Sequence, residues 1–232
     1  MIGRTTWDQA NCLVLNGDLK YFHVEELLRT PFYNYSWSYE KCEKYSIFIS
    51  QVYTPIKGFH VLIKAVSILK KKYPNVKVYI AGNDILNKNY LTLRGYGKIC
   101  KKLISKYNVA DNIRFTGKLT AEQMCSHYLK ANVYVCCSLI ENSPNSLCEA
   151  QIIGTPVVSS YVGGTPDFVT HKENGFLYRS EDYEMLAYYV DIVFELKEKI
   201  ADISDCERQT ALLRHSRSNY GNILLNVYKN LK

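Results

Sequence analysis

From Tyr45 onward, short apolar runs alternate with longer stretches in which apolar residues recur at helical spacing. Between Phe59 and Leu69 apolar side chains recur every three or four residues, and Pro74 ends the predicted helix. Strands are predicted for the apolar runs YSIFISQV (45–52), NVKVYIAG (75–82), IRFTG (113–117), NVYVCCS (132–138), TPVVSS (155–160) and GFLY (175–178). The alternation predicts an α/β domain: a doubly wound, Rossmann-like parallel sheet with flanking helices.

Residues 1–44 do not follow this alternation, because they are aromatic, polar and irregular. We therefore expect three parts along the chain: a connecting segment over residues 1–44, the sheet-and-helix domain over residues 45–215 and a C-terminal helix over residues 216–232. A polar loop is predicted over residues 83–97, after the second strand.

Glycines and polar residues follow the predicted strands, and in a doubly wound sheet ligands bind outside the carboxyl ends of the strands. Because parallel strands end at one edge of the sheet, these residues are expected to meet there and to form a ligand site. The pair Gly163 and Gly164 is equally well explained as a plain turn, since a positive φ favours glycine whatever lies nearby. The residues that follow the first four strands are Lys57, Gly58, Gly82, Asn83, Gly117, Lys118 and 141–146.

The stretch SLIENSPNSLCEA (138–150) predicts a helix that starts beside two carboxylates. Ser143 is a favoured N-cap and Pro144 suits the first helical position, so the backbone N–H groups of residues 145–147 are expected to be free. A helix N-terminus binds anions, and phosphate is the expected ligand. Glu149 would repel a phosphate, so we expect it to accept hydrogen bonds from a ribose, while Glu141 could do the same for the hydroxyls of a sugar. The stretch thus predicts one site for diphosphate, ribose and hexose.

The net charge favours an anionic partner. Lys and Arg number 29 against 22 Asp and Glu, a formal net charge of +7, which suits nucleic acid, acidic lipid or a phosphorylated small molecule. The excess is spread along the chain, and the basic clusters LKKKYPNVK and GKICKKLISK are explained as solvated helix faces. No nucleic-acid partner is expected.

Other classes of site lack their signatures in the sequence. The eight cysteines include no Cys-x-x-Cys pair and no histidine spacing that suits zinc, so we expect reduced thiols, no disulfide and no metal site. No run reaches the roughly 18 apolar residues of a membrane span, and the start lacks the apolar core of a secretory signal. None of the five histidines is assigned a catalytic role. No glycine motif of dinucleotide-dependent oxidoreductases or P-loop hydrolases is found either.

Four stretches resemble the retaining glycosyltransferases of family GT4, which have the GT-B architecture of two facing Rossmann-like domains. The stretch ENSPNSLCEA resembles the family's E-x7-E motif, and IKGFHVLIKAV resembles its Lys-Gly helix start. The flanking stretches IRFTGKLTAEQMCSHYLKANVYVCCS and GTPVVSSYVGGTPDFVTHKENGFLY are similar to those on either side of the motif. The resemblance runs over residues 45–178 and continues more weakly to the C-terminal helices. Residues 1–44 resemble the segment that links the two domains, so they are expected to be a remnant of an upstream acceptor-binding domain.

The resemblance implies the donor-binding half of a transferase. Such an enzyme moves a sugar from a nucleoside diphosphate sugar, here expected to be a UDP-sugar, to a glycan or lipid-linked acceptor, with retention and without a metal ion or other cofactor. The acceptor would be held by the upstream domain. The expected setting is bacterial polysaccharide biosynthesis in the cytoplasm, with peripheral contact to the inner face of the membrane.

Residue by residue, the resemblance assigns Glu149 to the ribose, Glu141 to the donor sugar and Lys57 to the distal phosphate. Glu141 and Lys57 are the expected catalytic residues. The backbone of residues 143–146 is expected to face the sugar and the phosphates. The full donor-binding set is Glu149, Gly58, Asn142, Ser143, Pro144, Asn145, Ser146, Leu147, Gly82 and Lys118.

Two positions depart from the family pattern. The family carries an arginine about five residues before the lysine, and this chain has Val52 there with Gln51 beside it, so half of the cationic clamp is missing. After the glycine pair the family often has Glu, where this chain has Asp167. Two alternatives stay open: a non-catalytic module of the same fold that binds a nucleotide or sugar phosphate, and a sugar phosphorylase, whose anion is free phosphate.

Overall fold

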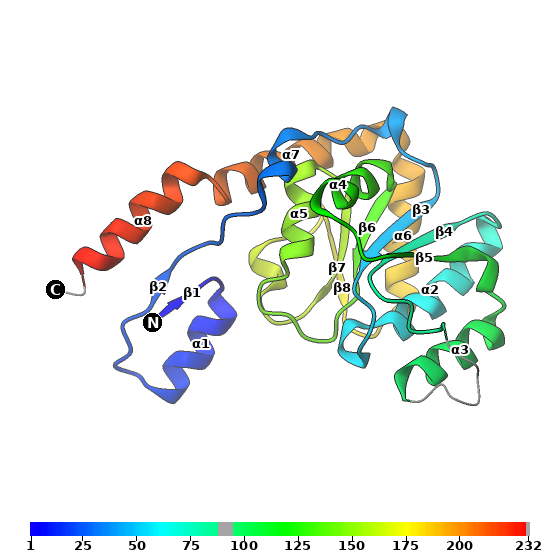
Figure 1. The fold of residues 1–232 in the computed structure, drawn as a ribbon, viewed down its shortest axis with the longest axis horizontal. Coiled ribbons are helices and arrows are strands. Elements are labelled where there is room, and N and C mark those ends of the chain that lie inside the picture. Colours follow the sequence, from blue (N-terminus) through cyan, green and yellow to red (C-terminus); the bar gives the residue numbers. More distant parts are fainter. Residues whose placement is uncertain (88–94, 231–232) are drawn as a thin grey trace.

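A computed structural model describes residues 1–87 and 95–230 (Figure 1). The predicted polar loop over 83–97 and the C-terminal helix over 216–232 therefore fall partly outside the described residues. Six parallel strands form the central sheet, in the order β5-β4-β3-β6-β7-β8. Their bounds are β3 Ser46–Ser50, β4 Lys77–Ala81, β5 Ile113–Gly117, β6 Val133–Cys136, β7 Val157–Tyr161 and β8 Phe176–Arg179. The predicted fold class is confirmed.

The order of the strands defines where a ligand can enter. The chain lays β4 and β5 outward from β3, then returns to place β6 on the other side of β3. The point where the winding reverses, between β3 and β6, leaves a crevice at the carboxyl ends of these two strands. Residues 51–58 follow β3, and residues 137–144 follow β6. Both segments belong to the predicted site.

Helices cover the two faces of the sheet in separate layers (Figure 1). On one face α2 packs against both α3 and α6, and on the other α5 packs against α4 and α7. Strands β3, β6, β7 and β8 are buried apart from end residues, which is why they appear in the sequence as largely apolar runs. In the edge strand β5 only Ile113 is buried. The bounds are α2 Phe59–Lys72, α3 Tyr96–Tyr107, α4 Ala121–Lys130, α5 Asn145–Ile153, α6 Tyr183–Leu196 and α7 Ile200–Arg214.

The N-terminal segment is partly a component of this domain. Leu28, Phe32, Trp37 and Cys42 are buried in the same core as the sheet. The Trp37 backbone N–H donates to the Ile153 carbonyl at 2.8 Å, and its indole Nε1 donates to a carbonyl on the neighbouring helix end. The 3-10 helix η1, Thr30–Asn34, lies against α4 and α5. Residues 28–42 are thus held by the domain, while the assignment of residues 1–44 to an upstream domain stays a prediction.

The first residues and the last helix project together from one side of the sheet domain (Figure 1). They comprise β1 Ile2–Gly3, α1 Thr6–Leu15, β2 Phe22–His23 and α8 Arg217–Lys229. Strands β1 and β2 pair with each other in parallel and do not join the main sheet. Within residues 1–87 and 95–230, no helix has both the length and the apolar character needed to cross a membrane.

Candidate functional site

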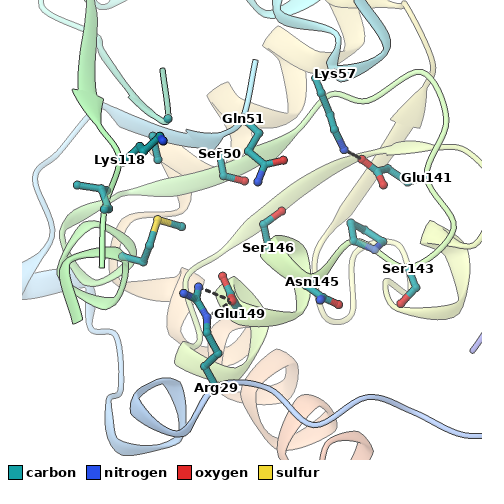
Figure 2. A pocket seen from close by; sticks show the side chains of 15 residues that line it. Arg29, Ser50, Gln51, Lys57, Lys118, Glu141, Ser143, Asn145, Ser146 and Glu149 are labelled. Carbon is teal, nitrogen blue, oxygen red and sulfur yellow. Dashed lines mark hydrogen bonds and ion pairs between the residues drawn. The ribbon is translucent and has the colours of Figure 1, made fainter. Parts of the chain in front are cut away.

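A cleft of about 570 Å³ opens at the reversal point of the sheet (Figure 2). It draws residues from the ends of β3, β4 and β5, from the start of α5 and from the N-terminal segment. Its lining is Arg29, Ser50, Gln51, Lys57, Ala81, Gly82, Lys118, Leu119, Met124, Glu141, Ser143, Pro144, Asn145, Ser146 and Glu149. The structure thus brings together both glutamates of the E-x7-E stretch and the two lysines predicted from the sequence.

Helix α5 begins one residue later than the sequence indicated. The predicted N-cap Ser143 is wrong: Pro144 is the N-cap, with φ −75° and ψ 103°, and Asn145 is the first helical residue. The helix tightens here because the N–H groups of Leu147 and Cys148 both donate to the Pro144 carbonyl, at 3.0 and 3.2 Å. In the described part of the chain, the N–H groups of residues 145 and 146 make no hydrogen bond, so two free donors face the cleft rather than the expected three.

Lys57 and Glu141 form an ion pair across the cleft (Figure 2). The Ser138 hydroxyl donates to the same carboxylate oxygen at 2.8 Å. Lys57 reaches this place because Gly58 adopts φ +70° and packs on the backbone of Cys137, where a Cβ would lie well inside 3.0 Å of the carbonyl oxygen. Gly58 therefore shapes the site from behind and is not part of the lining of the cleft.

Glu149 lies at the floor of the cleft, with a side chain that is 8% exposed. The Arg29 guanidinium donates to its Oε1 from Nη2 at 2.7 Å and from Nε at 3.1 Å. The Tyr128 hydroxyl lies 3.4 Å from Oε2. Burial raises the pKa of Glu149, while Arg29 and Tyr128 act in the opposite direction. Arg29 was missed by the sequence analysis, because it lies in the irregular segment whose only signal was its likeness to a linker.

The structure shows which side chains stand where the family pattern has an arginine. Val52 is 2% exposed and packs in the core, so it could not reach a ligand in any case. Gln51 has φ +54° and its side chain points into the cleft (Figure 2). A neutral amide therefore stands near the end of β3 where the family pattern implies a cation. Lys118, which follows β5, supplies positive charge from the opposite wall.

Two predicted donor-binding residues point elsewhere. Leu147 is fully buried in the core. Asn142 faces the N-terminal segment: its amide donates to Asp8 at 2.9 Å and its carbonyl oxygen accepts from the Thr5 hydroxyl. Arg4 adds a hydrogen bond to the Asn145 side chain at 3.0 Å. Residues 4–8 therefore hold the loop between Glu141 and α5 from the side away from the sheet.

The glycine pair also supports this loop. The Gly164 N–H donates to the Glu141 carbonyl at 3.0 Å. A Cβ on Gly163, which has φ +50°, would overlap that same carbonyl oxygen. Asp167, three residues on, accepts from the backbone N–H and the hydroxyl of Thr6. The pair is thus more than a plain turn, because it lets the chain approach the loop that carries Glu141.

The chemistry of the cleft suits an anion joined to a polyol. Each carboxylate is paired with a cation, Glu141 with Lys57 and Glu149 with Arg29, and Lys118 adds a further positive charge. The two free N–H groups at the start of α5 add hydrogen-bond donors for an anion. Among the described residues, no group of three or more histidine, cysteine or acidic side chains could hold a metal ion.

Comparisons with known proteins agree with this geometry. Residues 36–210 match the family model described as "Glycosyl transferases group 1". An "Uncharacterized glycosyltransferase" of Haemophilus influenzae is 28% identical over 153 residues, which cover 66% of this chain and 40% of the relative. A "D-inositol 3-phosphate glycosyltransferase" of Streptomyces scabiei is 29% identical over 136 residues, covering 55% of this chain and 28% of the relative. The chain therefore spans less than half the length of these curated relatives.

Solved structures share the fold over nearly the whole chain. TarM of S. aureus, solved as the G117R mutant with Fondaparinux, alpha-GlcNAc-glycerol and UDP, superposes with a TM-score of 0.82 at 19% identity. The match covers 98% of this chain and 43% of TarM. HepE of Anabaena, solved with UDP, gives a TM-score of 0.79 at 19% identity and covers 99% of this chain and 62% of that one.

Proposed function

Because the chain belongs to the glycosyl transferases group 1 family, we propose that it is the donor-binding half of a transferase that uses a UDP-sugar. The sugar is transferred with retention to a glycan or lipid-linked acceptor held by an upstream domain, in bacterial polysaccharide biosynthesis at the cytoplasmic face of a membrane. The observation that carries the proposal is the convergence of Glu141, Glu149 and the free N–H groups of α5 in one cleft. TarM and HepE, which share this fold, were both solved with UDP.

In this proposal the start of α5 and the two lysines hold the diphosphate. Breaking the bond between sugar and phosphate leaves an oxocarbenium-like sugar and adds negative charge to the leaving diphosphate. Stabilising that charge with fixed donors is the largest task of the site. Lys57 and Lys118 approach from opposite walls, and Asn145 and Ser146 at the start of α5 line the same cleft. Fixed positive charge replaces a metal ion, and no cofactor is used.

The two glutamates hold the neutral ends of the donor. Glu149 accepts hydrogen bonds from the ribose hydroxyls, and Glu141 accepts them from the donor sugar and orients it for the acceptor. The ion pair between Glu141 and Lys57 fixes both side chains before the donor arrives. When the diphosphate binds, Lys57 is shared between the carboxylate and the phosphate, and the Ser138 hydroxyl continues to hold Glu141.

Glu149→Ala is expected to weaken UDP binding by about 1–3 kcal/mol, because the variant loses a charged hydrogen-bond acceptor. The loss should be similar for uridine, which carries the ribose and no phosphate. Isothermal titration calorimetry with both ligands measures it. If the variant bound uridine and UDP as the parent does and lost affinity for inorganic phosphate alone, the ribose assignment would be wrong and a phosphorylase would become the better proposal.

Lys57→Ala is expected to lower the affinity for UDP-glucose at least tenfold, because Gln51 offers no second cation at the end of β3. Losing one partner of a half-buried charge pair costs roughly 2–5 kcal/mol, against under about 1 for an exposed pair. Uridine affinity should change little. Lys71→Ala, which removes an exposed lysine from the far end of α2, is the matched control. Equal losses for UDP-glucose and uridine would point to a damaged fold instead.

A further inference from the structure

Arg29 brings a charged group into the cleft from outside the family match. The match begins at residue 36, whereas Arg29 immediately precedes η1 in the N-terminal segment. Its guanidinium makes two hydrogen bonds to one oxygen of Glu149, and about half of the side chain is exposed to the cleft (Figure 2). The position of this arginine therefore bears directly on the donor site.

The place of the guanidinium is set by the packing beneath it. Its central carbon lies 4.8 Å from the centre of the Phe32 ring, a cation–π distance. Phe32 is fully buried and makes an edge-to-face contact with Tyr128, with ring centres 6.0 Å apart. Tyr128 in turn donates to the Ser146 carbonyl at 2.8 Å and approaches Glu149. This pair of aromatic rings thus positions both side chains that contact the carboxylate.

Within the described residues, Arg29 is the cation that faces Glu149. The other titratable groups around the carboxylate are uncharged, because burial raises the pKa of each; they are Tyr128 and Cys125 of α4, Tyr134 of β6 and Cys148 of α5. A carboxylate as buried as this one costs free energy unless it is paired. Without the guanidinium it would take up a proton at a higher pH than it does now.

The two oxygens of Glu149 are used unequally. Both Arg29 donors go to Oε1, while Oε2 has only the long contact of 3.4 Å to the Tyr128 hydroxyl. A carboxylate oxygen can accept two hydrogen bonds, so Oε2 is the oxygen with acceptor capacity to spare. An ionised and oriented Oε2 is what a pair of sugar hydroxyls requires.

We propose that Arg29 is a positioning residue for the donor: it keeps the Glu149 carboxylate ionised and turns its Oε2 toward the ribose hydroxyls. This inference rests on the proposed function for the identity of the ligand. It assigns a role in the site to the N-terminal segment, which carries Arg29 and the ring beneath it.

Arg29→Met tests the inference through the pH dependence of donor binding. UDP-glucose is the probe, because a diphosphate esterified at both ends does not titrate between pH 6 and pH 9. At pH 6 the variant is expected to bind at least tenfold more weakly than the parent, and its affinity should recover toward pH 9 as Glu149 ionises. Arg29→Lys, which keeps a cation, should bind nearly as the parent does, with a flat profile.

Arg217→Met is the matched control. Arg217 donates to the Thr30 hydroxyl at 2.9 Å and lies over the Tyr33 ring, so it anchors the same 3-10 helix without touching Glu149. This control should keep the parent's affinity at every pH. A pH-independent loss in Arg29→Met, or an equal loss in Arg217→Met, would mean that the arginine only stabilises the segment and would overturn the inference.

A measurement without ligand separates this inference from the proposed function. The Glu149 carboxyl can be titrated by carbon NMR and assigned with Glu149→Gln. Its pKa is expected to be higher in Arg29→Met than in the parent, and Arg29→Gln serves equally if the methionine variant unfolds. An unchanged titration would overturn the role of Arg29 even if UDP-glucose binds. If the parent chain bound no UDP-glucose while the pKa of Glu149 rose in Arg29→Met as expected, the proposed donor would be wrong. The role of Arg29 in keeping Glu149 ionised would still hold.

Discussion

Gly58→Ala is expected to lower the free energy of unfolding by about 2–5 kcal/mol. Two costs add: a non-glycine residue at φ +70° loses roughly 1–2 kcal/mol, and the new methyl group would press on the Cys137 carbonyl, an overpacking cost of about 1–3 kcal/mol. Relief requires one of two backbone segments to shift, because this contact joins the start of α2 to the residue that follows β6. Urea unfolding followed by circular dichroism measures the change.

Gly117→Ala separates the two costs. This glycine has φ +78°, close to that of Gly58, but a Cβ built on it meets no atom within 4 Å. It should therefore show only the backbone cost of about 1–2 kcal/mol. If both variants lost the same amount, the close approach to Cys137 would have no energetic weight, and the position of Lys57 would need another explanation.

Glu207→Gln is expected to stabilise the protein at pH 7, by about 1.4 kcal/mol for each pH unit between 4.5 and the folded pKa of the carboxyl. Glu207 is fully buried on α7, and the backbone of Val157 acts against the effect of burial on the pKa of its carboxyl. Burial raises its pKa well above the ordinary value of 4.5. The folded state therefore holds a proton that the unfolded state releases above pH 4.5. Holding it costs about 1.4 kcal/mol per pH unit, and a neutral amide avoids that cost.

The sign of the pH dependence makes this prediction specific. Stability from the raised pKa is fully present below pH 4.5 and is lost as the pH rises toward the folded pKa. The parent and Glu207→Gln should thus have similar stability near pH 4, and the variant should become the more stable of the two as the pH rises. Thermal melts recorded at intervals from pH 4 to pH 8 measure this difference. Asp205→Asn, an exposed substitution on the same helix, should show the same dependence of stability on pH as the parent. A constant gap between Glu207→Gln and the parent would show that the carboxyl is not neutral when folded.

The fold could be predicted from the sequence because apolar periodicity reports burial directly. Strands buried on both faces appear as apolar runs, and helices with one buried face show a three-to-four residue repeat. The cleft could be predicted in part for a related reason: the residues that line it follow directly after strands whose ends meet at one edge. Lys57, Lys118 and Glu141 were found in this way.

What the sequence could not predict depends on contacts between distant segments. Arg29 contacts Glu149 across 120 positions of sequence, and the pair of aromatic rings that positions it leaves no periodic signal in the sequence. The support of Gly164 for the Glu141 loop is likewise a tertiary contact. The start of α5 was misplaced because the Pro144 carbonyl accepts two N–H groups, a choice that residue preferences at helix starts do not settle.

The hydrogen bonds of residues 4–8 couple the start of α1 to the loop that carries Glu141. Thr5 is fully buried and holds Asn142 together with Asp8, while Thr6 holds the turn at Asp167. A movement of the first turn of α1 would be transmitted to the Glu141 loop directly through these hydrogen bonds. A displacement of that helix is therefore expected to move the Glu141 end of the cleft before the Glu149 end, because Glu149 is held instead by Arg29, next to η1.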